Sequence, residues 1–347
     1  MATAEVSHQH VINPIDLLEQ VAGTHDWHFD RSADDELTLT VAGTWTDYHM
    51  SINWRPDLEA LHLASLDILE RIGVRFNEPE ALDYFRRAGA RVDAADNRVR
   101  IGRDIVAAAI RTLPERFAFT TYNPARSVSI GGDDLAVTTV LGPPYCSDLD
   151  RGRRNGSLAD FSDFLRLAQV FNAVHMIGWP VEAVEVEVPV RHLAQTEAML
   201  RLSDKVPYVF CQSRQRIHDV LDMIAIAKGT TRDGLVGDPS TYSIINTNTP
   251  LTYDTPMASG VIEMARHGQP TLITPFTLAG ATTPVSVAAA ITLCNAEILA
   301  GATLAQLVRP GAPVVYGGAV TSVDMKTGAP AYASPEYLKA ASITGAL

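Results

Sequence analysis

The sequence has 347 residues, of which 46% are hydrophobic and 20% are charged. This composition supports a sizeable hydrophobic core and excludes an intrinsically disordered chain. The formal net charge of -12 argues against a nucleic acid or an anionic membrane as the partner, because both would repel an acidic surface.

The chain has three cysteines, Cys146, Cys211 and Cys294, which are far apart in the sequence and form no CxxC pair. Widely spaced cysteines and a polar start, MATAEVSHQH, are typical of the reducing cytoplasm, so we expect a cytoplasmic protein. Each cysteine is predicted to be a small buried apolar residue, since free cysteine is among the most buried residue types.

Residues 1–63 are predicted to form a small α+β segment. The stretch PIDLLEQVAG is typical of a short amphipathic helix, and the apolar–polar alternation of ELTLTVAGTWTDYHMSINW predicts antiparallel strands. His8 and His10 are spaced like a pair of metal ligands, but no third ligand accompanies them, so we favour an ordinary polar terminus.

Three stretches of this segment are distinctive: NPIDLLEQV, DWHFDRSADDEL and VAGTWTDYHMSINWRPDLEALHLA. Through them residues 11–64 resemble the start of the YbjN family, small α/β domains described as sensory transduction regulators. The resemblance brings no catalytic residues and implies a structural or interaction appendage.

Residues 64–127 are predicted to be a helical lead-in to the larger part of the chain. SLDILERIGVRF, EPEALDYFRRAGARVD and DIVAAAIRTL have apolar residues at helical spacing. Gly89 is expected to end the second of these helices.

Residues 128–347 contain six short apolar runs separated by helical patterns. The runs are residues 136–141, 174–180, 206–212, 241–246, 271–276 and 314–317. Helices are predicted between them at residues 158–171, 190–201, 216–228 and 257–266, with Ser157 as the N-cap of the first.

A spacing of roughly 30 to 45 residues between strands is typical of repeated βα units in an α/β fold. Six such units predict a (β/α)8 TIM-type barrel that is incomplete, because closure needs eight. Two explanations remain open, a piece of a longer enzyme or a sheet that closes in another way.

The last of these units, residues 269–318, is predicted to be strand, helix and strand. Thr282 and Thr283 are expected to cap the helix, Pro284 suits its first turn, and a helical crossover of this length implies parallel strands. The helix is long and apolar enough to be read as a membrane span instead, but it contains polar residues such as Glu297, so we favour a soluble crossover helix.

The predicted strand ends carry few titratable catalysts: the sequence contains no HxH metal motif at these positions, no GxSxG elbow and no P-loop. A metal-dependent barrel hydrolase is therefore disfavoured. The aromatic residues at these ends are Tyr145, Trp179, Phe276 and Tyr316. Aromatic faces that converge on one site hold an ammonium ion by cation–π attraction, although each ring could equally be core packing. We predict the amides of Gln212, Asn246 and Asn248 to position a carboxylate or hydroxyl of the substrate.

Four further stretches are distinctive: LDILERIGVRFNEPEAL, AGARVDAADNRVRI, YCSDLDRGRR with LADFSDFLRLAQVF, and QPTLITPFTLAGATTPVSVAAAITLCNAEILAGATLAQLVRPGAPVVYGG with VDMKTGAPAYASPE. Through them residues 64–347 resemble the trimethylamine methyltransferase (MttB-like) family. The resemblance implies a TIM barrel and the transfer of an N-methyl group from a tertiary or quaternary amine to the Co(I) of a separate corrinoid (cobalamin) protein. It implies no cofactor bound in the chain itself, and it identifies no catalytic residue.

The sequence departs from this family in two ways. The founding enzymes carry pyrrolysine near the position of AVTSVDMKTG, which here contains only ordinary residues, so the resemblance implies the branch whose substrates are betaine-like rather than trimethylamine. The family's last two strands are also missing. These departures leave open an alternative, a non-catalytic fragment or fusion with a binding or regulatory role, and a homo-oligomer is compatible with either function.

Overall fold

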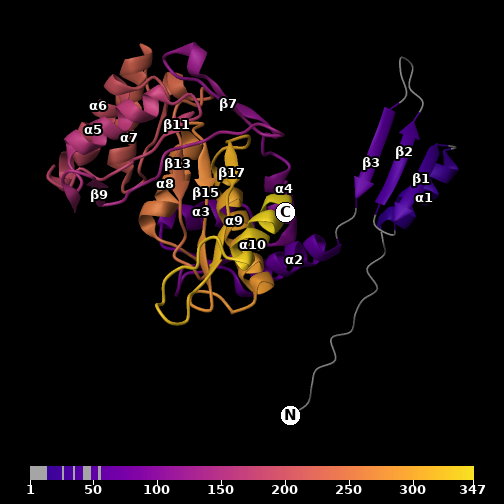
Figure 1. Ribbon diagram of the computed structural model, residues 1–347. Coiled ribbons are helices and arrows are strands. Elements are labelled where there is room, and N and C mark those ends of the chain that lie inside the picture. The colour runs from indigo at the N-terminus through magenta and orange to yellow at the C-terminus, as the bar shows by residue number, and fades with distance from the viewer. Residues whose placement is uncertain (1–13, 26, 34–35, 42–47, 54–55) are drawn as a thin grey trace. The chain divides into compact units, whose positions relative to one another are not determined.

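The computed structural model describes residues 14–25, 27–33, 36–41, 48–53 and 56–347. It contains two compact units that divide between Leu61 and His62 (Figure 1). The predicted metal pair His8 and His10 lies outside the described residues.

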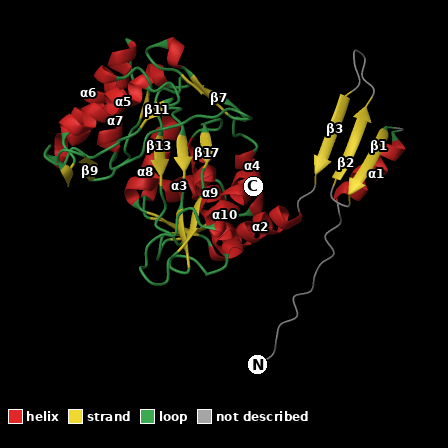
Figure 2. Cartoon of the chain, in the orientation of Figure 1, coloured by secondary structure: helices red, strands yellow, loops and turns green. Residues whose placement is uncertain are grey.

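The smaller unit contains one helix and a three-stranded antiparallel sheet (Figure 2). Its elements are α1 (Pro14–Thr24), β1 (His28–Ala33), β2 (Glu36–Val41) and β3 (Tyr48–Asn53), with β2 in the centre of the sheet. Ile15 and Ala22 of α1 are buried with Leu37 and Leu39 of β2, as the alternation along β2 requires. The predicted helix and antiparallel strands are confirmed.

The lead-in to the larger unit contains short strands as well as the predicted helices. Helix α2 (Pro56–Asp67) passes into a π-helical turn (Ile68–Ile72), and α3 and α4 follow. The elements after that turn are β4 (Val74–Phe76), α3 (Pro79–Arg87), β5 (Arg91–Asp93), β6 (Arg98–Arg100) and α4 (Arg103–Ile110). The helical prediction missed the three strands, because each has only three residues and one partner of β4 is β14 (Thr252–Tyr253), far away in sequence.

Two antiparallel hairpins lie between α4 and the helix that begins at Leu158. They are formed by β7 (Phe117–Phe119) with β8 (Val128–Ile130) and by β9 (Tyr145–Asp148) with β10 (Gly152–Asn155). The second hairpin occupies the stretch that follows the first predicted apolar run.

All six predicted apolar runs lie in one succession of parallel pairings. Thr138 bridges Met176, and Tyr208 bridges Tyr242, which links the short strands into one series. The strands of the series are β11 (Met176–Ile177), β12 (Val206–Pro207), β13 (Ser243–Ile245), β15 (Thr271–Ile273) and β17 (Val314–Tyr316). Strands β13, β15 and β17 lie side by side in Figure 1.

One helix follows each strand position of this series, as the βα pattern predicts. The helices are α5 (Leu158–Val170), α6 (Val188–Leu202), α7 (Arg214–Lys228), α8 (Thr255–Arg266) and α9 (Val287–Val308), and α10 (Pro335–Ala346) comes at the end. The predicted N-cap of α5 is confirmed: the Ser157 hydroxyl accepts a hydrogen bond from the backbone N–H of Asp160. The protein therefore has a mixed α/β fold.

The predicted strand at residues 271–276 is interrupted. β15 ends at Ile273, and after Thr274 and Pro275 a separate strand, β16 (Phe276–Ala279), pairs in parallel with β18 (Ala319–Ser322). Proline lacks the N–H that a continuous ladder needs, which accounts for the break at Pro275. Phe276 consequently begins a second ladder instead of ending the first.

Helix α9 confirms the predicted crossover between β15 and β17, but its cap differs from the prediction. The Ser286 hydroxyl accepts a hydrogen bond from the Ala289 N–H and caps the helix, whereas Thr282 accepts from the Leu278 N–H and closes the preceding turn. By length and composition α9 could cross a membrane, yet 78% of its apolar window is buried inside the protein, as in a core helix.

A glycine in the middle of α9 permits its close approach to the strands. A Cβ atom at Gly301 would lie 2.2 Å from the Tyr253 hydroxyl and 2.8 Å from Cδ1 of Ile273. Tyr253 is fully buried and donates a hydrogen bond of 2.8 Å to the backbone carbonyl of Glu297. The absence of a side chain at Gly301 thus allows this buried contact.

A network of ion pairs joins α3, α7 and α8. The carboxylate of Glu263 in α8 is 1% exposed and accepts hydrogen bonds from Arg214 and Arg266, and His218 Nε2 lies 2.9 Å from its second oxygen. The two arginines also pair with Glu80 of α3. Burial by itself raises the pKa of Glu263, but the hydrogen bond from His218 and the charges of Arg266 and Arg214 outweigh it, so the pKa lies below its usual value.

We predict that Gly301→Ala lowers the free energy of unfolding by roughly 1 to 3 kcal/mol, because the new methyl group overlaps Tyr253. Helix propensity alone would raise stability by about 1 kcal/mol. Gly345→Ala is the matched control: Gly345 lies exposed in α10, and a Cβ atom there would have no neighbour within 4 Å, so no loss is expected. Urea denaturation followed by circular dichroism measures both, and a stabilised Gly301→Ala protein would contradict the packing argument.

We predict that Glu263→Gln destabilises the protein at pH 7 by on the order of 2 kcal/mol, an amount reduced by the partial exposure of both arginines. Because folding lowers the pKa of Glu263 from 4.5, its contribution is present above that pH and is lost as the pH falls through the folded-state pKa. Thermal unfolding as a function of pH should show a flatter acid limb for Glu263→Gln. The exposed control Glu187→Gln should follow the wild type, and an unchanged acid limb in Glu263→Gln would refute the assignment.

Candidate functional site

A cavity of about 610 Å³ lies beyond the carboxyl ends of the parallel strands. Its lining residues follow four successive strand positions and continue to the start of α8. They are Leu141, Gly142, Trp179, Glu182, Tyr208, Phe210, Gln212, Ile244, Asn246, Thr247, Asn248, Asp254 and Met257. In an α/β sheet this edge is where ligands bind, so the cavity is the candidate site.

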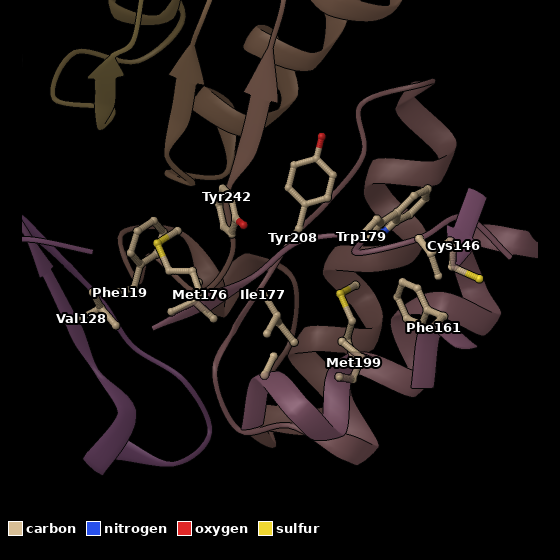
Figure 3. Packing of buried hydrophobic residues seen from close by; sticks show 14 residues of the cluster. Phe119, Val128, Cys146, Phe161, Met176, Ile177, Trp179, Met199, Tyr208 and Tyr242 are labelled. Atoms are coloured by element: carbon tan, nitrogen blue, oxygen red, sulfur yellow. The ribbon is translucent and has the colours of Figure 1, made fainter. Parts of the chain in front are cut away.

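Three aromatic rings form one wall of the cavity. Trp179 follows β11, and its ring centroid lies 6.2 Å from that of Tyr208 in an edge-to-face arrangement and 5.3 Å from that of Phe210. Figure 3 shows Trp179 and Tyr208 side by side above the packed side chains of Ile177 and Met199. Burial raises the pKa of Tyr208, so its hydroxyl stays neutral. The wall thus presents π faces and no charge.

Polar side chains from the ends of β12 and β13 form another part of the lining. Gln212 follows the aromatic residues, and Asn246 and Asn248 follow β13. The Asn246 side-chain oxygen accepts a hydrogen bond of 3.0 Å from Thr274, whereas the amides of Gln212 and Asn248 have no hydrogen-bond partner among the described residues. The two amides have donors and acceptors available to a ligand.

The only charged residues that line the cavity in the described part of the chain are acidic. The Glu182 carboxylate pairs with Arg191, which lies outside the lining, and Asp254 accepts a hydrogen bond of 2.8 Å from the Met257 N–H at the start of α8. No lysine, arginine or histidine is among the lining residues. Two carboxylates beside aromatic faces favour a cation in this cavity.

The four aromatic residues predicted from strand ends do not come together. Only Trp179 lines the cavity; Tyr145 lies in β9 under the guanidinium of Arg153, 4.1 Å from the ring centroid. Phe276 packs against Tyr332, with ring centroids 6.4 Å apart. The hydroxyl of Tyr316 donates a hydrogen bond of 3.1 Å to Asn295 of α9, and burial raises its pKa. The expected four-ring site is therefore not formed by these residues.

The sequence interpretation missed Tyr208 and Phe210, although a signal for them is present. Successive side chains in an extended chain alternate between two faces, so residues 208, 210 and 212 point to the same side. Gln212 is a predicted site residue, and a period of two extends that prediction to both rings. No local sequence pattern predicts that Glu182 lines the cavity, because this residue lies in a loop whose position is set only by the tertiary fold.

The described residues contain one group that could hold a metal ion: His218, Glu263 and His267, whose ligand atoms lie within 4.8 Å of one another. Its ligand atoms already have partners, because the Glu263 carboxylate forms ion pairs with two arginines and Nδ1 of His267 lies 2.9 Å from the Glu263 backbone carbonyl. Two guanidinium groups would repel a metal cation, so we interpret the group as part of the ion-pair network.

The three cysteines are buried and free, as predicted. Burial raises the pKa of Cys211 and of Cys294 to about 12, so neither thiol is ionised near neutral pH. None of the three lines the cavity.

Comparisons with known proteins identify relatives of the chain. The family model described as trimethylamine methyltransferase (MTTB) matches residues 35–347. The match begins before residue 64, inside the segment that resembles YbjN, and the YbjN resemblance stays a prediction.

Three curated relatives show the range of named activities. A glycine betaine methyltransferase of Desulfitobacterium hafniense (strain Y51) is 34% identical over 280 residues, which cover 80% of this chain and 58% of that relative. A trimethylamine methyltransferase of D. hafniense (strain DSM 10664 / DCB-2) is 27% identical, with 81% and 56% covered. A proline betaine:corrinoid methyltransferase of Eubacterium limosum is 28% identical, with 81% and 59% covered. The chain thus spans between half and two thirds of the length of these relatives.

Proposed function

Because the chain belongs to the trimethylamine methyltransferase (MTTB) family, we propose that it acts in the transfer of an N-methyl group from a quaternary amine to a corrinoid protein. Within this proposal the parallel strands are part of a (β/α)8 TIM-type barrel, and the protein works in the cytoplasm. The cavity beyond the strand ends is the amine-binding site.

The observation that carries the proposal is a cavity with aromatic walls and acidic residues but without any basic side chain. A quaternary ammonium group is a permanent cation that cannot donate a hydrogen bond, so aromatic faces are its best partners. Trp179, Tyr208 and Phe210 would surround the methyl groups, and the negative field of Asp254 would strengthen the attraction.

The amides at the strand ends favour a betaine over a simple methylated amine. A betaine carries a carboxylate beside the ammonium group, and Gln212 and Asn248 offer amide donors for it. Trimethylamine would leave these polar groups without a ligand partner. Two of the relatives named above act on betaines by their names, which agrees with this substrate class.

The proposed chemistry needs orientation and desolvation more than acid–base catalysis. The corrinoid is a co-substrate, presented by a partner protein, that supplies the Co(I) nucleophile. As the methyl carbon leaves, the amine nitrogen keeps the electron pair of the broken C–N bond, so no proton is removed from the substrate. Trp179 and Phe210 hold the cation, and the amides fix its direction. This accounts for a cavity without a histidine or lysine.

We predict that Phe210→Leu and Trp179→Leu each weaken glycine betaine binding by about 2- to 30-fold, because each removes one cation–π face worth about 0.5 to 2 kcal/mol. Isothermal titration calorimetry measures the affinity. Tyr145→Leu is the matched control, since Tyr145 lies outside the cavity, and its affinity should equal that of the wild type.

Methyl transfer itself is tested with the full chain, a reduced cognate corrinoid protein and a panel that contains glycine betaine, proline betaine, choline and trimethylamine. We expect methylation of the corrinoid, followed by its absorption spectrum, with betaines as the best donors. The proposal would be wrong if no member of the panel bound to the protein or donated a methyl group.

A further inference from the structure

Glu297 has a buried carboxyl group that is hydrogen-bonded to a loop in the cavity wall. It lies in the middle of α9 with no exposed surface. Its Oε2 accepts hydrogen bonds from the hydroxyls of Thr247 and Thr249, the latter at 2.8 Å, and its Oε1 accepts from the backbone N–H of Leu251 at 2.6 Å. All three donors belong to the loop that follows β13.

The same loop supplies part of the cavity lining. Asn246, Thr247 and Asn248 all line the cavity. Leu251 has a φ of +52°, a left-handed conformation that is unfavourable for leucine. Its N–H bonds to Glu297, and its carbonyl accepts a hydrogen bond of 2.9 Å from the Arg75 N–H. The three bonds to Glu297 thus hold a strained loop in the position that shapes the cavity.

No basic side chain forms an ion pair with Glu297 in the part of the chain that the structure describes. The titratable groups around it are Tyr253 of β14, whose hydroxyl donates to the Glu297 backbone carbonyl, and Cys294 of α9. Burial raises the pKa of both, so both are neutral. Burial likewise raises the pKa of Glu297, although the three hydrogen bonds oppose this effect. The carboxyl group thus lacks a compensating positive charge in the ligand-free protein.

Thr247 connects this carboxyl group to the cavity. It lines the cavity on one side and donates its hydroxyl to Glu297 on the other. A cation in the cavity would therefore be separated from Glu297 by one residue. In a buried environment of low effective dielectric constant, a positive charge at that separation favours the ionised carboxylate.

We propose that Glu297 positions the 247–251 loop and releases its proton when a quaternary ammonium ion enters the cavity, which makes it the buried counter-charge of the bound cation. The inference rests on the proposed function, because it requires a cation at this site. Glu182 and Asp254 differ from Glu297, since the first pairs with Arg191 and the second caps α8.

The sign of the pH effect follows from the charge. The cation lowers the pKa of Glu297 relative to the ligand-free protein, so between the two pKa values binding releases a proton and affinity rises with pH. Above both values Glu297 is already ionised and affinity no longer depends on its proton. The affinity for the cation thus rises with pH, and binding releases at most one proton per cation.

The experiment is isothermal titration calorimetry of the full chain with tetramethylammonium chloride, whose charge is independent of pH, in buffers that differ in ionisation enthalpy. We expect the wild type to release up to one proton per bound cation on the acid side of neutrality. Glu297→Gln, which keeps a hydrogen-bonding amide, should bind the cation without proton release. The exposed control Glu187→Gln should release protons as the wild type does.

Infrared difference spectra of the wild type provide a measurement that does not depend on a folded variant. Cation binding should remove the C=O band of a protonated carboxyl group. Cation binding without proton release and without loss of this band would overturn the role of Glu297 and leave the proposed function intact. Proton release that persists in Glu297→Gln but disappears in Glu182→Gln would also overturn it. If neither tetramethylammonium nor glycine betaine bound, both proposals would fail.

Discussion

The burial of α9 is the constraint on which the rest of the larger unit depends. The helix packs against α3, α4, α8 and α10 and against the strands on both sides of its own crossover. Residues 290–306 of the helix are buried apart from the half-buried Leu293, so each polar residue among them needs a partner inside the protein. Those partners are the groups that fix the surrounding elements.

Three polar residues of α9 illustrate this point. The Asn295 amide donates to Ser65 of α2 and its oxygen accepts from Tyr316 of β17, so it joins the lead-in to the last parallel strand. Gln306 bonds the turn after α9 through the Gly311 N–H. Glu297 holds the loop beside the cavity. Helix α9 has the composition of a membrane span, yet it lies at the centre of a polar network. Its apolar residues are buried by the hydrophobic effect, and its polar residues form hydrogen bonds inside the protein.

The ends of the parallel strands determine which residues form the cavity wall. Parallel strands bring their carboxyl ends to one edge, so residues from four separate parts of the sequence share one wall. Trp179 and Tyr208 pack edge to face and are buried, which holds both rings rigidly. A rigid apolar wall with acidic neighbours loses little entropy when it binds a cation, and this favours recognition by shape and charge.

Local sequence determined the repeat of this protein: the six apolar runs, the helices between them and the Ser157 cap all follow from periodicity and capping chemistry, which act over a few residues. Tertiary structure decided which strand ends share a cavity. Trp179 reaches it, whereas Tyr145 turns into a hairpin with Arg153 and Phe276 enters a second ladder after Pro275. Glu297 could not be assigned to the site from sequence, because its three donors lie about 50 residues away and meet it only when α9 packs on the strands. Periodicity reports which face of an element is buried, but the partner of a buried polar group is chosen by long-range packing.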